Sequence, residues 1–168
     1  MFEHLANFSK ILVTGPQRSG TTICARMIAH DLLYDYLDEE KIGIRNYNHT
    51  VEAIRENNYF VLQCPGMSRW VHEIAAEHGP LAVVWMRRDI ADIIASQERI
   101  DWDGEDIEKR QYREKQGPIS AIKYRFWDTC QRYIVPTYYE VDYDDLYVHP
   151  LWVPTEQREK WGPRQWKV

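Results

Sequence analysis

Cysteine is scarce in this 168-residue chain, and long apolar runs are missing. The three cysteines, Cys24, Cys64 and Cys130, lie far apart and form no CxxC pair, which argues against a zinc site or a disulfide framework. No apolar run approaches the roughly 20 residues that cross a bilayer. The first residues, MFEHLANFSK, lack the basic and then apolar stretches of a secretory signal. These absences favour a protein of the reducing cytoplasm.

Positive charge is also in short supply. The chain has 21 Lys and Arg against 26 Asp and Glu, a formal net charge of −5, so it is a poor candidate for general nucleic-acid binding. A local basic site for one small anion remains compatible with this balance. We therefore expect neither a nucleic acid nor a membrane as the partner.

The overall composition is that of a globular domain. Hydrophobic residues make up 44% and charged residues 28%, a balance typical of folded proteins. The chain shows no internal repeat, no low-complexity stretch and no linker rich in Pro, Gly or Ser. We therefore expect a single domain over residues 1–168.

Short apolar runs alternate along the chain with segments of helical periodicity. Strands are expected at Lys10–Thr14, Tyr59–Gln63, Leu81–Met86 and Tyr138–Val141. Helices are expected from Thr21 to Leu32, from Val51 to Glu56, from a Ser68 cap to about His78, from Asp89 to Ile100, and from Pro118 onward, where Ile119, Ile122, Phe126 and Cys130 repeat. Residues 34–50 are expected to form a loop with a short element, and 105–115 a charged helix or lid. The alternation predicts an α/β fold of three layers with a mainly parallel central sheet.

The segment after the first expected strand has the spacing of a Walker A loop with one departure. Gly15–Thr22 reads GPQRSGTT, and Thr21 stands where the G-x-x-x-x-G-K-[ST] pattern has Lys. Backbone N–H groups and the helix start would bind an anion there, helped by the Thr21 and Thr22 hydroxyls and the Arg18 guanidinium. Enzymes of nucleoside triphosphates use the missing Lys on the β- and γ-phosphates. The loop therefore predicts an anion site in a P-loop nucleotide-binding-like fold, and its sequence argues against ATP or GTP hydrolysis.

A second candidate anion site follows the third expected strand. Arg88 lies at the strand end and Ser96 about two helical turns further on, so both could bind one phosphate. Alternatively, Arg88 pairs with Asp92 and Ser96 is a surface residue. Two anion sites in one α/β domain suit a nucleotide that is negatively charged at two separate positions.

In these two segments the chain resembles the P-loop sulfotransferases, which use 3′-phosphoadenosine 5′-phosphosulfate (PAPS). The family's P-[KR]-S-G-T-[ST] loop for the 5′-phosphosulfate is matched by Arg18 and the SGTT that follows it. The family's R-[DN]-P-x-D-x-x-x-S motif for the 3′-phosphate is matched by RDIADIIAS, with Arg88 and Ser96 in register and Ile90 in place of Pro.

Two weaker similarities lie further along the chain. The segment Tyr143-Asp144-Asp145-Leu146 is similar to a family segment near the adenosine, and REKWGPRQW is similar to a basic loop that closes over the cofactor. The resemblance implies PAPS as cofactor, 3′-phosphoadenosine 5′-phosphate (PAP) as product, and no metal. The implied cofactor-binding residues are Gly15, Gln17, Arg18, Ser19, Gly20, Thr21, Thr22, Arg88, Ser96, Tyr143, Arg158 and Lys160, with Arg164 as a further contact.

The resemblance also implies a mechanism, with one departure from the family. Many members carry a Lys at the end of the second expected strand to stabilise the leaving phosphate, whereas this chain has Gln63. Arg18 is the candidate to take over that task. Some relatives use a carboxylate shortly after the first helix as the base, and here Glu39 is favoured, with Glu40, Asp38 and His49 as alternatives.

Two other functions stay open at this point. A P-loop small-molecule or nucleotide kinase would need the missing Lys and a Mg²⁺ carboxylate, for which Asp89 and Asp142 are the candidates. A catalytically inactive PAP-binding module would fit the loss of the family's Lys at Gln63. The acceptor of a sulfotransferase could be a small molecule, a carbohydrate, a lipid or a peptide tyrosine, and the sequence does not choose between them.

Overall fold

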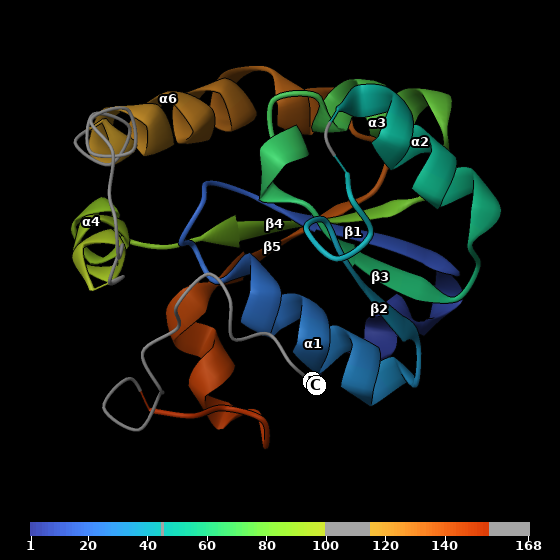
Figure 1. Cartoon of the computed structure of the whole chain (residues 1–168), viewed down its shortest axis with the longest axis horizontal. Helices are drawn as coiled ribbons and strands as arrows, with labels where there is room; N and C mark the ends of the chain where they lie inside the picture. Colours follow the sequence, from blue (N-terminus) through green and yellow to red (C-terminus); the bar gives the residue numbers. More distant parts are fainter. Residues whose placement is uncertain (45, 100–114, 155–168) are drawn as a thin grey trace.

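A five-stranded parallel sheet forms the centre of the protein in a computed structural model that describes residues 1–44, 46–99 and 115–154 (Figure 1). The strands are β1 (Lys10–Thr14), β2 (Asp35–Asp38), β3 (Phe60–Gln63), β4 (Ala82–Arg87) and β5 (Tyr138–Asp142). Their order is β2-β3-β1-β4-β5, and each neighbouring pair is parallel. The α/β prediction with a mainly parallel sheet is confirmed.

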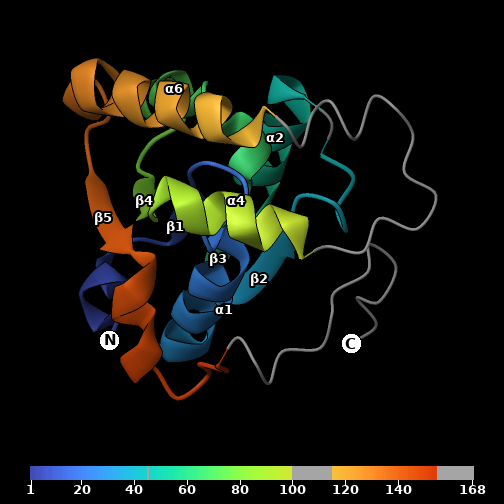
Figure 2. The same cartoon turned by 90° about the vertical axis from the view of Figure 1, so that its left-hand side faces the viewer.

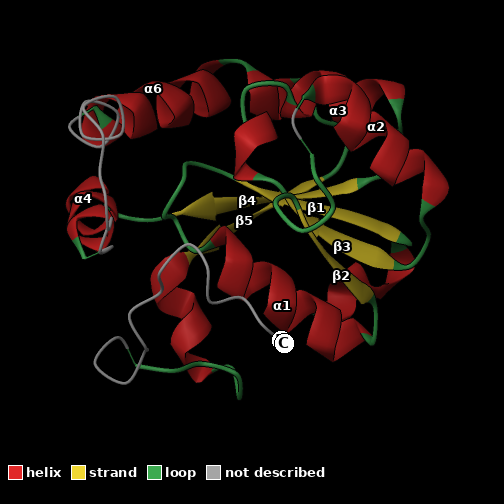
Figure 3. Cartoon of the chain, in the orientation of Figure 1, coloured by secondary structure: helices red, strands yellow, loops and turns green. Residues whose placement is uncertain are grey.

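Helices cover both faces of the sheet, as Figure 3 shows. The α-helices are α1 (Thr21–Leu32), α2 (Tyr47–Glu56), α3 (Val71–Glu77), α4 (Ile90–Glu98) and α6 (Gln116–Thr129), and the short 3₁₀ helices are η1 (Glu3–Asn7), η2 (Pro65–Met67), η3 (Gln131–Tyr133) and η4 (Tyr143–Val148). In Figure 1, α1 and η4 lie below the sheet, whereas α2, α3 and α6 lie above it. None of the described helices is long and apolar enough to cross a membrane.

Alternate residues of β1 show how the two faces form separate cores. Ile11 and Val13 are fully buried on the face that packs against Ile28 of α1. Leu12, between them, is buried on the opposite face together with Trp127 of α6. Because both faces are covered, the central strands are continuously apolar, and that is why their positions were predictable.

The edge strand β2 is the main departure from the predicted elements, since only four strands were expected. Asp35–Asp38 reads DYLD, and the strand pairs with β3 alone. An edge strand needs no continuous apolar run, because one side of it has no neighbouring strand, and here Asp35 at its start is exposed. Nothing in its composition therefore separated it from the surrounding loop.

Some helices begin at other residues than predicted, among them α6, which begins at Gln116 and not at Pro118. The helix expected from Val51 starts at Tyr47, because the Asn46 side chain accepts a hydrogen bond from the His49 backbone N–H at 3.1 Å and caps the first turn. Ser68 was expected to cap the next helix, but α3 starts only at Val71 and has no side-chain cap. Ser68 is buried at the end of η2 instead.

Aromatic stacking fixes α6 on the sheet. The rings of Trp127 and Trp85 in β4 stack with centroids 4.3 Å apart and planes 4° from parallel. Trp127 Nε1 also donates to Glu140 Oε1 of β5 at 2.8 Å. Arg87 forms ion pairs with Asp128 and with Glu140. The carboxyl-terminal half of α6 is thereby held against β4 and β5.

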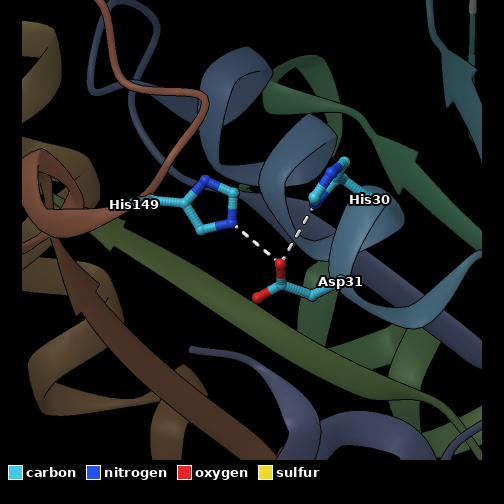
Figure 4. Close-up of side chains that lie close together, drawn as sticks. All are labelled: His30, Asp31 and His149. Carbon is cyan, nitrogen blue, oxygen red and sulfur yellow. Dashed lines mark hydrogen bonds and ion pairs between the residues drawn. The ribbon is translucent and has the colours of Figure 1, made fainter.

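A hydrogen-bond hub joins the end of α1 to the segment after η4 (Figure 4). Asp31 Oδ1 lies 2.9 Å from Nε2 of the buried His149 and 3.2 Å from Nδ1 of His30. The other Asp31 oxygen accepts from the backbone N–H of Phe2 at 3.2 Å. Burial alone would raise the pKa of Asp31, but these donors hold that pKa well below its usual range.

Asp31→Asn tests whether this hub stabilises the fold. The lowered pKa means that the carboxylate adds stability in full above the usual carboxyl pKa of about 3.9, and that this stability is lost as the pH falls further. We expect the variant to lose about 1–2 kcal/mol of unfolding free energy at pH 7, measured by urea denaturation. The difference in unfolding free energy between variant and wild type should be smaller near pH 3. Asp35→Asn on the exposed end of β2 is the matched control. Equal losses in both variants would contradict a specific role for Asp31.

Candidate functional site

The predicted anion loop lies between β1 and α1 and has the backbone conformations of such a loop. Gly15 and Gly20 have φ values of +146° and +97°, and Arg18 has φ of +66°. A left-handed conformation costs a non-glycine residue about 1–2 kcal/mol, so the surrounding loop must hold Arg18 in place. The loop is closed by Ser19, whose backbone N–H and Oγ both donate to the Pro16 carbonyl, at 3.2 and 2.7 Å.

Hydrogen bonds from β1 and β3 hold this loop at the carboxyl edge of the sheet. Thr14 Oγ1 donates to the Cys64 carbonyl at 2.9 Å, which joins the ends of β1 and β3. Gln63 Nε2 donates to Thr21 Oγ1 at 3.2 Å, and both side chains are buried. Because Thr21 accepts this bond with its oxygen, its own O–H is left to donate to an anion in the loop.

The two predicted anion segments meet in space. Arg18 Nε and Nη2 both donate to Ser96 Oγ in α4, at 3.3 and 3.1 Å. Arg88 Nη1 donates to the Arg18 carbonyl at 3.1 Å. The prediction joined Arg88 to Ser96 around a phosphate, and in the structure Arg18 is the residue in direct contact with Ser96. Arg18 thus contacts the second segment twice, through its side chain to Ser96 and through its carbonyl to Arg88.

Tyr143 from η4 packs against the same cluster. The Arg88 guanidinium lies over the Tyr143 ring, with its carbon 3.8 Å from the ring centroid. The same ring also lies against Gly20, where a Cβ atom would overlap it. The third predicted segment therefore reaches the anion loop, and Gly20 is needed both for its backbone conformation and for this close approach.

The other members of the predicted site divide into three groups. The loop and first-turn positions Gly15, Gln17, Arg18, Ser19, Gly20, Thr21 and Thr22 all lie at the junction of β1 and α1. Asp89 caps α4 by accepting from the Ala91 N–H at 2.7 Å, and Asp142 is exposed at the end of β5. The predicted contacts Arg158, Lys160 and Arg164, and most of the expected lid at 105–115, lie outside the described residues.

Among the candidate bases, Glu39 has the most developed environment. Its Oε2 accepts from Cys64 Sγ and from the Gly66 backbone N–H, both at 3.1 Å. Burial raises the pKa of Glu39 above its ordinary value, while these two hydrogen bonds partly oppose the rise. A carboxyl group with a raised pKa is well suited to proton transfer near neutral pH.

The three alternative bases lie in less suitable surroundings. Asp38 is buried and already accepts hydrogen bonds from the Tyr36 hydroxyl at 2.8 Å and from the Glu40 N–H at 3.0 Å. Glu40 is exposed next to it, and His49 is exposed on α2. Of the four, Glu39 is the one held by groups at the end of β3.

Lys123 of α6 joins this site and was not predicted. Burial lowers the pKa of Lys123, the nearby Glu39 charge opposes that change, and Arg69 adds to it. The sequence pattern did not indicate Lys123, because the apolar repeat of α6 favoured burial of Ile122 and Phe126. In the structure Ile122 is 67% exposed and Phe126 is 37% exposed.

A possible metal site was tested on the donors that it offers. In the part of the chain that the structure describes, His30, Asp31 and His149 form a group whose ligand atoms all lie within 4.8 Å of one another. His149 Nδ1 accepts from the Leu151 N–H at 3.1 Å, so the proton of the neutral ring is on Nε2 and faces Asp31. A metal ion bound to Nε2 would displace that proton to Nδ1. The proton would then face the Leu151 N–H, which is itself a donor. The group therefore fits a hydrogen-bond hub better than a metal site.

Comparisons with known proteins identify the fold. No protein-family model and no curated protein matches the chain. Shikimate kinase from Acinetobacter baumannii, solved in complex with shikimate, matches with a TM-score of 0.53 at 15% identity, over 84% of this chain and 88% of that chain. A sugar kinase from Janibacter sp. matches with a TM-score of 0.49 at 11% identity, over 80% and 85%. At such identities the likeness shows the fold alone: the chain has a P-loop nucleotide-binding-like α/β fold.

Glu39→Gln tests the electrostatics of the candidate base. A carboxyl group whose pKa is raised by folding binds more protons in the folded state, so its ionisation lowers stability as the pH rises through and above the usual carboxyl range. We expect the variant to melt at a higher temperature than the wild type at pH 8, and the difference to vanish near pH 4. Differential scanning calorimetry measures this, with exposed Glu40→Gln as the control. A lower melting temperature for Glu39→Gln at pH 8 would refute the assignment.

Proposed function

We propose that this protein is a sulfotransferase that binds PAPS and transfers its sulfuryl group to a hydroxyl or amine acceptor. The observation that carries the proposal is the convergence of Arg18, Arg88 and Ser96 at an anion loop whose Walker Lys is replaced by Thr21. A ligand with two separate anionic groups fits this arrangement better than a triphosphate, whose charges lie in one run.

The described residues fit the two anionic ends of PAPS. The loop N–H groups and the Thr21 and Thr22 hydroxyls would hold the 5′-phosphosulfate, as expected of a loop at a helix N-terminus. Arg88 and Ser96 would hold the 3′-phosphate, with Arg18 between the two groups. When bound, PAPS supplies the sulfuryl group and a phosphate leaving group.

The roles of the protein's own residues follow from their positions. Glu39 takes the proton of the acceptor hydroxyl or amine, and its environment keeps the pKa of its carboxyl raised. Arg18 and the loop amides stabilise the negative charge that develops opposite the acceptor. Gln63 orients the Thr21 hydroxyl through the 3.2 Å hydrogen bond and thus acts as a positioning residue. Alignment of acceptor and donor supplies the remainder of the catalysis.

A kinase is the second candidate function, and the fold likeness to shikimate kinase supports it. Such an enzyme would bind a triphosphate at the loop and would need Mg²⁺. Thr21 in the Lys position does not supply the usual cation. Of the two candidate metal carboxylates, Asp89 caps α4 and Asp142 is exposed at the end of β5. An inactive PAP-binding module of the same fold is the third possibility.

Calorimetric titration separates these functions. We expect PAP to bind in the micromolar range without metal, and ATP with Mg²⁺ to bind far more weakly, because the two-site arrangement matches PAP. Binding of ATP with Mg²⁺ but not of PAP would make the kinase the correct function. Binding of PAP without sulfuryl transfer from PAPS to any member of an acceptor panel would indicate the inactive module.

Arg88→Ala tests the assignment of the 3′-phosphate. The variant should weaken PAP binding by about 1.5–3 kcal/mol, roughly 10- to 150-fold in Kd. Binding of adenosine 5′-phosphosulfate should change little, because this ligand lacks the 3′-phosphate. Arg55→Ala on the exposed side of α2 is the control for a general loss of positive charge. Equal losses for both ligands in Arg88→Ala would refute the assignment.

A further inference from the structure

One stripe of α6 faces the sheet and carries polar side chains. Gln116, Ser120, Lys123 and Trp127 fall within about 60° of one another around the helix axis, at about 100° per residue. Trp127 stacks flat on Trp85 of β4, which orients the whole stripe toward the sheet. The polar members of the stripe are therefore directed inward, whereas the apolar Ile122 and Phe126 are exposed.

The amino-terminal half of α6 extends past the carboxyl ends of the strands. Figures 1 and 2 show this half of the helix beside α4, beyond the tip of β4. Two contacts fix it there: Gly117 packs against Ile94 of α4 so closely that a Cβ would lie 2.9 Å from the Ile94 Cδ1, and the Tyr124 hydroxyl lies 2.9 and 3.1 Å from the Arg88 backbone N and O. Ser120 and Lys123 are thus placed over the edge of the sheet that carries the anion loop.

Two buried atoms on the inner stripe of α6, Gln116 Nε2 and Ser120 Oγ, have no hydrogen-bond partner among the described residues. The same holds for Ser68 Oγ after η2, near the other end of α6, where the Ser68 carbonyl accepts from Gln131. Ser120 is fully buried, and Gln116 and Ser68 are each 1% exposed. Buried polar groups are normally hydrogen-bonded, so the inner stripe of α6 carries polar groups that the described residues do not satisfy.

Lys123 brings a positive charge to the same place. The charges of Glu39, after β2, and of Arg69, after η2, both act on Lys123. The Lys123 ammonium has neither a hydrogen bond nor an ion pair within 4.0 Å to any residue in the described ranges. The site therefore has two cations and one carboxylate, and the Lys123 ammonium is available to a ligand.

We propose that the inner stripe of α6, together with Glu39 and Arg69, is the acceptor site, and that the acceptor is a small molecule with both an anionic group and a hydroxyl. The anionic group binds Lys123 and Arg69, and the hydroxyl reaches Glu39. The role of Glu39 in this inference rests on the proposed group transfer. The binding of the anionic molecule does not depend on it. Lys123 is a specificity-determining residue in this site.

The test uses a matched pair of small probes that needs no nucleotide. Glycolate carries one carboxylate and one hydroxyl, and ethylene glycol is its neutral counterpart. In an NMR titration of the isotope-labelled full-length protein, we expect glycolate to shift the backbone amide signals of Gly66 and Ser120 in a saturable manner. Ethylene glycol at the same concentrations should leave both signals in place.

Variants on α6 identify the cation responsible. Lys123→Met should raise the Kd for glycolate at least tenfold, Lys123→Arg should restore most of the affinity, and Arg125→Met on the exposed side of the same helix should change nothing. Unshifted Gly66 and Ser120 signals, or equal binding by the wild type and Lys123→Met, would overturn the proposal. PAP binding with no glycolate binding would refute the acceptor site alone, whereas glycolate binding with no PAP binding would refute the proposed sulfotransferase and leave the anion-binding site in place.

Discussion

The central position of β1 is the constraint on which the candidate site depends. β1 pairs with β3 on one side and β4 on the other, so the loop that follows it lies between the ends of both neighbours. Thr14 bonds the chain after β3, and Gly15 lies against the Met86 carbonyl of β4. Because both faces of the sheet are covered by helices, a ligand is expected at this edge, where residues far apart in the sequence meet.

The parts of this edge that could be predicted were those with a local signature. Backbone geometry and helix capping identified Gly15, Gly20 and the two Thr residues after Gly20 as candidates. Helical spacing after a buried strand identified Arg88 and Ser96. Glu39 was one of four neighbouring candidates, and its contacts with Cys64 Sγ and the Gly66 N–H separate it from the others. Such a contact depends on the pairing of β2 with β3, which the sequence of an edge strand does not reveal.

Lys123 could not be predicted because the hydrophobic pattern of α6 is inverted. A helix that covers a core normally buries its apolar stripe, and here the buried stripe holds Gln116, Ser120 and Trp127. The large stacked surface of Trp127 on Trp85 anchors the helix, so that its amino-terminal half does not need apolar burial. Hydrophobic periodicity is least informative where a helix leaves the core and covers a polar site.

The 3₁₀ helix η4 contacts α1 at both of its ends. Tyr143, at the start of η4, packs on Gly20, which caps the first turn of α1, and His149, just after η4, bonds Asp31 in the last turn. The chain after β5 thus contacts α1 near both ends of that helix. A change at Asp31, a helix length away from the anion loop, would therefore loosen the Tyr143 ring against that loop. The hub in Figure 4 is therefore coupled through η4 to the loop after β1, although none of its three side chains lies there.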